Sequence, residues 1–249
     1  MTVSGNSAPR SSAESVDLAA KVGRVAAPLR QQVLDVLRQA ILSFHYAPGQ
    51  RLIERELVEE IGVSRTTIRE VLRELAAEGL VKTIPQKGAV VVVPSPQEAL
   101  ELYELRAALE ALAVRRFTEV ASDEQVAELR AAFEQLAEAA GGDGGNTLRI
   151  LKAKDQFYDA LLRGCGNRSV HATLSGVQAR LSLLRATSLA QPGRTARSVQ
   201  ELRTVIEAVE ARNAEAAVRA CNHHIEQAKR AGLEGLSATS GLPFSSASL

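Results

Sequence analysis

The stretch "EEIGVSRTTIREVLRELAAEGLV", residues 59–81, decides the fold of the first part of this 249-residue chain. Ser64 is a good helix N-cap, because its side-chain oxygen can accept a hydrogen bond from a backbone N–H of the first turn. Apolar residues then recur at the i, i+3, i+4, i+7 spacing of one buried helix face, as Ile68, Val71, Leu72 and Leu75. The stretch therefore predicts a helix that starts after Ser64 and stops at Gly79.

The opposite face of this helix carries cations close to its start. Arg65 and Arg69 lie in the first two turns, where the positive end of the helix macrodipole disfavours a cation by up to about 1 kcal/mol. Arginines at these positions are expected in a helix whose N-terminal end binds an anionic partner. The alternative is a surface helix whose arginines pair with Glu70 or Glu74.

The segments around the helix favour the anionic partner. Residues 27–44 and 54–61 read as two earlier helices, and residues 80–93 read as two β-prone runs joined by a turn that contains Lys87 and Gly88. Helix, helix, turn, helix and hairpin is the order of a winged helix-turn-helix, whose reader helix enters the major groove of DNA by its N-terminal end. The candidate contacts at that end are Ser64, Arg65, Thr66, Thr67 and Arg69.

The rest of the chain reads as helical. Residues 93–99, "VPSPQEA", mark the boundary, because two prolines end the hairpin and Ser95 can cap the next helix. Helices are predicted at about 97–119, 123–140, 147–164, 168–190, 195–211 and 214–231. The predicted parts are a flexible tail at 1–24, a winged helix-turn-helix domain at 25–94, a helical bundle at 95–233 and a flexible tail at 234–249. The fold class is mainly α.

The first part resembles a known family. Residues 47–91 contain a "PG-x-x-L" turn followed by "SRTTIREVLRELAAEGL", and they are similar to the DNA-binding domain of GntR-type transcription factors, over about residues 28–93. The resemblance implies that operator contacts come from Arg55, Arg65, Thr67 and Arg69. It also places Ser64 at the start of the reader helix and Gly88 at the wing tip near the minor groove. Lys87 is either a further DNA contact or a solvated loop lysine, because the wing turn is a residue or two longer than in some relatives.

The second part resembles the FCD ligand-sensing domain of the FadR subfamily. The resemblance covers about residues 97–231 and rests on "LYELRAALEALAVRR", "FYDALLRGCGN" and "SVQELRTVIEAVEARNAEAAVRACNHHI". Many FCD domains hold a metal ion through one Asp and three His side chains, and the metal helps to hold a small organic acid. The matching positions here are Lys154, Tyr158, Leu202 and His224. Because one imidazole cannot supply the three or four ligands that such a site needs, we predict that the metal is absent and expect no cofactor.

Two cations lie on apolar faces of the helical part. Arg106 shares a stripe with leucines of its helix, and Lys154 shares one with Ile150 and Phe157. A buried cation is costly unless it is paired. Arg106 either pairs with Glu110 one turn on or faces a ligand, and the resemblance favours the ligand.

Lys154 has two interpretations as well. It either replaces the metal in holding an acidic effector or extends to the surface and leaves a degenerate pocket. Tyr158 is expected to form a pocket wall, and His224 is either a ligand contact or a satisfied core histidine. The predicted effector site is Arg106, Lys154, Tyr158 and His224.

These observations predict a ligand-responsive transcriptional regulator, most simply a repressor. A homodimer would place two reader helices about 34 Å apart on a near-palindromic double-stranded operator, and a small organic acid would control its affinity. The alternative is a constitutive DNA-binding protein whose helical domain only dimerises. An enzyme is disfavoured, because no nucleophile–base spacing and no phosphate-binding glycine loop are present. No apolar run approaches the roughly 20 residues of a membrane helix, and no signal peptide is recognisable, so we expect a cytoplasmic protein with no membrane partner.

Overall fold

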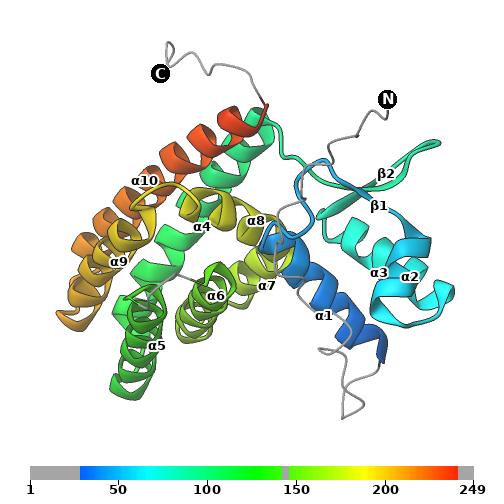
Figure 1. The fold of residues 1–249 in the computed structure, drawn as a ribbon. Helices are drawn as coiled ribbons and strands as arrows, with labels where there is room; N and C mark the ends of the chain where they lie inside the picture. The colour runs from blue at the N-terminus through cyan, green and yellow to red at the C-terminus, as the bar shows by residue number, and fades with distance from the viewer. Residues whose placement is uncertain (1–28, 142–145, 241–249) are drawn as a thin grey trace, which may run out of the picture.

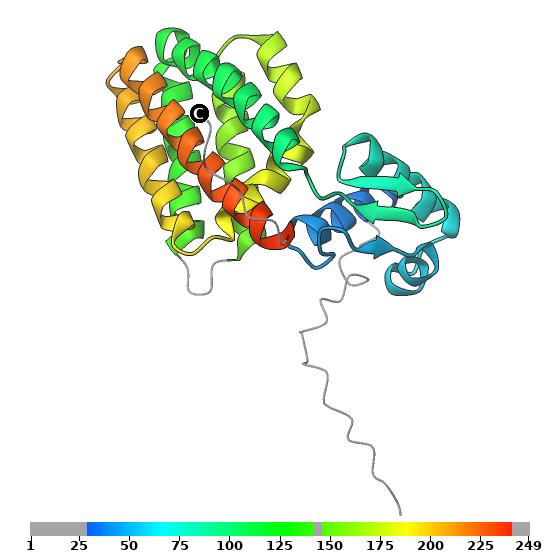
Figure 2. The ribbon, with the colours of Figure 1, turned by 90° about the horizontal axis from the view of Figure 1, so that it is seen from above.

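The computed structural model of the chain describes residues 29–141 and 146–240. The predicted N-terminal tail, residues 1–24, lies outside these ranges. The described residues form two parts that lie side by side, a small one with a sheet and a larger helical one (Figures 1 and 2). None of the helices in these ranges is both long and apolar enough to cross a membrane.

The first part is a winged helix-turn-helix, as predicted. Its elements are α1 (Leu29–Leu42), β1 (Arg51–Leu52), α2 (Glu54–Ile61), α3 (Arg65–Ala77), β2 (Val81–Ile84) and β3 (Gly88–Val91). The three strands form an antiparallel sheet in the order β1-β3-β2, in which Arg51 lies opposite Val90 and Val81 lies opposite Val91. The sequence did not predict β1, because two residues are too few to show an alternating pattern.

Apolar faces of α1 and α3 make the core of this part. Leu37 of α1 and Ile68 and Leu75 of α3 are fully buried in the same cluster, and burying each such side chain stabilises the fold by about 1.5–3 kcal/mol. Arg38 joins the two helices from outside the core, because its guanidinium donates to both carboxylate oxygens of Glu78 over 3.0 and 2.6 Å. The reader helix is therefore fixed by its inner face and leaves its outer face free.

The second part is the predicted all-helical bundle. Its elements are α4 (Pro96–Val120), α5 (Asp123–Gly141), α6 (Thr147–Gly164), α7 (Arg168–Gly176), α8 (Gln178–Leu189), α9 (Arg194–Glu210) and α10 (Ala214–Ser240). Helix α10 lies between α4 and α9, and α5 packs beside α6 (Figures 1 and 2). Ser95 caps α4 as predicted, because its side chain accepts from the backbone of Glu98 while the Glu98 carboxylate accepts from the backbone of Ser95.

One predicted helix is in fact two. The helix expected over residues 168–190 breaks at Val177, whose φ and ψ are −114° and 6°. The preceding residue is Gly176, which has the weakest helix preference apart from proline. The chain therefore changes direction there, and α8 is a separate helix that lies between the two parts of the molecule.

The predicted end of the last helix is also wrong. The sequence predicts a helix end at residue 231 and a flexible tail from residue 234, yet α10 continues to Ser240. Leu233 and Leu236 lie three residues apart and extend the apolar face of the helix, and Leu236 is 4% exposed in the bundle core. Burial of this extra turn explains why the serine- and glycine-containing segment stays helical.

Helix α8 belongs to both parts of the molecule. Leu181 and Leu184 pack in the core of the bundle, whereas Leu183 and Ala186 pack in the core that contains α1 and α3. The turn after α3 also approaches α8 closely, because a Cβ at Gly79 would lie 2.9 Å from Cδ of Arg180. Helix α8 therefore connects the core of the bundle with the core of the winged helix-turn-helix.

Candidate functional site

The first candidate site is the exposed start of α3. The backbone N–H of Thr67 donates to Oγ of Ser64 over 3.1 Å, and the two hydroxyl oxygens lie 2.9 Å apart. These bonds cap α3 as the sequence predicted. Thr66 and Arg65 beside them are exposed, so the first turn presents hydroxyl and guanidinium groups on a rigid helix end.

The arginines of α3 do not form the pairs that a plain surface helix would use. Arg65 makes no hydrogen bond or ion pair with any described residue, and Glu74 pairs with Arg30 of α1. Arg69 instead donates through Nε to Oε2 of Glu54 over 2.8 Å. Pairing with Glu70 or Glu74, the alternative left open by the sequence, is therefore not observed for these two arginines.

The remaining predicted DNA contacts come from α2 and the wing. Arg55 is exposed and donates to Glu59 one turn on over 2.9 Å, a type of surface pair that contributes little to stability. Lys87 and Gly88 are exposed at the tip of the β2–β3 hairpin, where Gly88 adopts a φ of 80°. The wing tip thus lies on a different element from α2 and α3 (Figure 1).

The second candidate site is a polar cavity inside the bundle, of about 10 Å³, which is the room of a single water molecule. Its walls come from α4, α6, α8, α9 and α10. The polar side chains that line it are Arg106, Lys154, Arg185, Ser188, Arg194, Ser198 and His224. None of these lining residues is an acid, and four of them are arginine or lysine.

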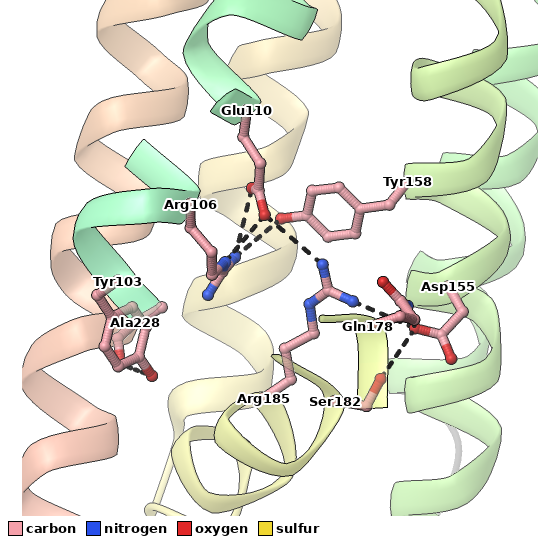
Figure 3. Close-up of polar contacts among 9 residues, drawn as sticks. All are labelled: Tyr103, Arg106, Glu110, Asp155, Tyr158, Gln178, Ser182, Arg185 and Ala228. Atoms are coloured by element: carbon pink, nitrogen blue, oxygen red, sulfur yellow. Dashed lines mark hydrogen bonds and ion pairs between the residues drawn. The ribbon is translucent and has the colours of Figure 1, made fainter. Parts of the chain in front are cut away.

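Arg106 and Glu110 form the pair that the sequence analysis left open. Nε of Arg106 lies 2.9 Å from Oε1 of Glu110, and each side chain is 1% exposed. Arg106 also donates to the hydroxyl of Tyr158 over 3.3 Å (Figure 3). Burial alone would raise the pKa of Glu110, but Arg106 and Arg185 hold it below its ordinary value, so the carboxylate stays charged.

Arg185 extends this network to α6. Its Nη1 donates to Oδ1 of Asp155 over 3.2 Å, its Nη2 lies 3.6 Å from Glu110, and its guanidinium stacks 4.1 Å from the ring centre of Tyr158 (Figure 3). Arg185 is not among the residues predicted from the sequence, although it lies on the same helical stripe as Leu181 and Leu184. The stripe argument that selected Arg106 could have found it.

Lys154 does not extend to the surface. Its side chain is buried, the residue being 4% exposed, and no carboxylate lies within ion-pair distance among the described residues. Burial, and then the neighbouring charges of Arg185 and Arg106, lower the pKa of Lys154 well below its ordinary value. Its amino group therefore faces the same cavity as the arginines, with no carboxylate among the described residues close enough to pair with it.

His224 contacts a carboxylate that the sequence analysis did not select. Its Nδ1 lies 2.7 Å from Oε2 of Glu201, which also accepts from Arg194 over 2.7 Å. Burial and the nearby Lys154 lower the pKa of His224 well below its ordinary value. The ring is therefore neutral near pH 7, Nδ1 carries the proton that Glu201 accepts, and Nε2 presents a lone pair.

Five polar atoms at this cavity are buried without a hydrogen-bond partner among the described residues. They are Arg106 Nη1, Arg185 Nε, Arg194 Nε, Ser198 Oγ and His224 Nε2. Folded proteins leave few buried polar atoms unpaired, and each one costs about 1–3 kcal/mol. Five such atoms surround one cavity: the arginines and Ser198 can donate hydrogen bonds there, and Nε2 of His224 can accept one.

The residues at the FCD metal positions do not fit a metal ion. Leu202 is buried in apolar core, Lys154 carries an amino group in place of a carboxylate, and the hydroxyl oxygen of Tyr158 accepts a hydrogen bond from Arg106. No group of three His, Cys, Asp or Glu side chains within the described ranges could hold a metal. The absence of the metal stays a prediction, to be checked by metal analysis of protein purified without a chelator.

Comparison with known proteins finds a family match for each of the two parts of the chain. Residues 29–91 match the gntR family of bacterial regulatory proteins, and residues 101–227 match the FCD domain. The HTH-type transcriptional regulator YdhC of Bacillus subtilis (strain 168) is 28% identical over 84% of this chain and 94% of its own length. The HTH-type transcriptional repressor RspR of Escherichia coli (strain K12) is 24% identical over 80% of this chain and 87% of its own.

A solved structure shows the same fold. A protein of Rhodococcus sp. RHA1 described as a GntR transcriptional regulator superimposes with a TM-score of 0.69 at 22% identity, over 82% of this chain and 97% of that one. The FCD match alone spans half of the chain, and the relatives are transcriptional regulators and not enzymes. The chain belongs to the GntR family of bacterial transcriptional regulators and carries an FCD domain.

Proposed function

We propose that this regulator is a homodimeric repressor whose affinity for its operator is controlled by a small organic acid bound in the cavity of the bundle. The observation that carries the effector part is the set of five unpartnered buried polar atoms on a cavity lined by cations. The name of RspR supports the repressor part, because that relative is a repressor.

The operator would be read from α3. Arginine side chains in the major groove recognise guanine O6 and N7, and short hydroxyls contact bases or phosphates. Arg65 and Arg69 have the exposure for the first role, and Ser64, Thr66 and Thr67 for the second. Arg55 and Lys87 would contact phosphates, and Gly88 would let the wing approach the minor groove. Two copies related by a dyad imply half-sites about 34 Å apart.

The effector would bind among the cations of α4, α6, α8 and α9. A carboxylate supplies several acceptor lone pairs, which match the free donors of Arg106, Arg185 and Arg194. Lys154 adds positive charge at the position where metal-binding FCD domains have an acidic ligand. Nε2 of His224 is an acceptor, so it would suit a hydroxyl or protonated group of the same ligand.

The binding signal would pass through α8. The cavity of about 10 Å³ is smaller than any organic acid, so a ligand must move its walls apart. Arg185 forms one wall, and Leu183 and Ala186 of the same helix pack into the core of the winged helix-turn-helix. A shift of α8 would therefore change the position of α3 relative to its copy in the dimer.

The test is a panel of small monocarboxylic and dicarboxylic acids screened against the full chain by thermal shift, followed by operator titrations. The operator is first selected by the protein from fragments of its own genome. One acid should raise the melting temperature and weaken operator binding, and Arg106→Ala should lose this response while it still binds the operator. A panel with no shift would favour the alternative, a constitutive DNA-binding protein with a dimerisation domain.

A further inference from the structure

Arg69, a candidate base reader, is held by a carboxylate from another helix. Its Nε donates to Oε2 of Glu54 over 2.8 Å, which ties the second turn of α3 to the first residue of α2. The two side chains are 54% and 37% exposed. An exposed ion pair adds little to stability, so the needs of the fold do not explain this contact.

The other cations of this surface are arranged differently. Arg65 and Arg73 of α3 form no hydrogen bond or ion pair with the described residues, and Arg55 is bonded through Nη1 to Glu59 within its own helix. Among the three arginines of α3, Arg69 is thus the one that a different helix orients. The contact is specific to that position.

The atoms used in the contact leave the reading end of the side chain free. A guanidinium bonded through Nε still presents Nη1 and Nη2 as a planar fork, which matches O6 and N7 of guanine end-on. A free arginine loses much rotamer freedom when it is fixed on a base. Glu54 restricts the Arg69 side chain beforehand, so less freedom is lost on binding.

The negative charge of Glu54 has a second effect on DNA. Non-specific affinity comes from cations that neutralise phosphates, and a carboxylate at the interface reduces it. At a wrong base pair the Arg69–Glu54 pair would lose water without gaining a base acceptor, which penalises the wrong sequence. Glu54 therefore lowers the affinity for DNA of any sequence and increases the difference in affinity between the operator and other sequences.

We propose that Glu54 is a specificity-determining positioning residue, which aims Arg69 at one guanine of the operator and disfavours other sequences. The inference rests on the proposed DNA-reading role of α3. A competing role for Glu54 is purely local, because an acid in the first turn of α2 favours the positive end of that helix. Glu56 lies in the same first turn and has no ion pair among the described residues, so it provides a matched control.

The experiment uses the full chain and a pool of random DNA duplexes, from which the wild type enriches its preferred sequences. The same enrichment is done with Glu54→Ala, Glu56→Ala, Arg69→Ala and the double variant at 54 and 69, with melting temperatures as a check of folding. Arg69→Ala identifies the base pair that Arg69 reads. Glu54→Ala should lose about 5- to 150-fold of the preference at that same base pair while binding a scrambled duplex more tightly.

The control separates the two roles. Glu56→Ala should also tighten binding to the scrambled duplex, because it removes one negative charge, yet it should keep the full base preference. The double variant should show the preference of Arg69→Ala alone. Glu54→Ala that keeps the preference, or that loses it only as much as Glu56→Ala does, overturns the proposal. If the wild type enriches no sequence, the proposed DNA-reading function itself fails and this inference fails with it.

Discussion

Lys154 lies in surroundings that stability alone would not select. It is buried among Arg106, Arg185 and Arg194 without a carboxylate of its own, and burying an unpaired charge costs several kcal/mol. Its depressed pKa means that the unfolded chain binds the proton more tightly than the folded one. Stability must therefore rise with pH until the unfolded side chain also loses its proton, near its ordinary pKa of 10.5.

Lys154→Met should accordingly stabilise the protein. Met has a similar length and no charge to desolvate, so we expect a gain of about 1–4 kcal/mol at pH 7. Urea unfolding between about pH 7 and 10 measures it. The stability of the wild type should approach that of the variant as the pH rises, and parallel curves would show that Lys154 is not the cause of the cost.

Arg65→Ala should weaken binding to the selected operator by about 1–3 kcal/mol and relax the preference at one base pair. The guanidinium at the helix start is exposed and unpaired among the described residues. No bond within the protein must therefore break before it binds a base, and its removal costs the whole of that contact. Titrations with the operator and its single-base variants measure both effects. Unchanged affinity and preference would remove Arg65 as a base reader.

Sequence reasoning finds residues whose neighbours are close along the chain. The stripe around Arg106 and its possible pair with Glu110 are visible at helical spacing. Glu201 is not, because it meets His224 and Arg194 only after two helices pack. Arg185 lies in a helix that is buried on nearly every side. The sequence of this helix therefore shows no clear division into a buried and an exposed face against which a buried charge could be recognised.

At the scale of elements, most helices start and end within one residue of the prediction, because caps and glycine breaks mark them. Two helix boundaries differ from the prediction. The single Gly176 is too weak a local signal to predict the break at Val177, and the extra turns to Ser240 depend on packing contacts that local preference does not contain. The sheet shows the same limit, since β1 exists only through its pairing with β3.

Helix packing also makes a prediction about two glycines. Gly164→Ala should destabilise the bundle by about 1–3 kcal/mol, because the new Cβ would clash with the ring of Phe117 on α4. Gly176→Ala should be neutral or stabilising by up to about 1 kcal/mol, because its Cβ would meet nothing within 4 Å. Urea unfolding of both variants measures the difference, and equal stabilities would contradict the close approach of α4 and α6.

At the scale of the whole molecule, α8 is the element that packs into both the bundle and the winged helix-turn-helix. Its leucines divide between the two cores, with Leu184 in the bundle and Leu183 in the core of the winged helix-turn-helix. The predicted order of domains follows from the sequence, but this docking does not. The residues on both sides of the contact are apolar, and an apolar pattern in the sequence does not indicate which other element it packs against.

Leu183→Ala should reduce the coupling between the two sites. Both Leu183→Ala and the control Leu184→Ala should lower stability by about 2–5 kcal/mol, since both side chains are buried. With an effector in hand, the ratio of operator affinities with and without it should fall markedly for Leu183→Ala and little for Leu184→Ala. Equal ratios in the two variants would show that the signal bypasses this contact.

If the bundle binds an effector as proposed, the small cavity of about 10 Å³ would also set how sensitive the regulator is. A ligand that fits only a rarely populated open form binds with its intrinsic dissociation constant divided by the fraction of molecules that are open, so its apparent affinity is lower. The concentration that triggers release then depends on the balance between closed and open forms as well as on the contacts with the acid. Substitutions remote from Arg106 and Lys154 that loosen α8 would let the same binding residues respond to a scarcer metabolite.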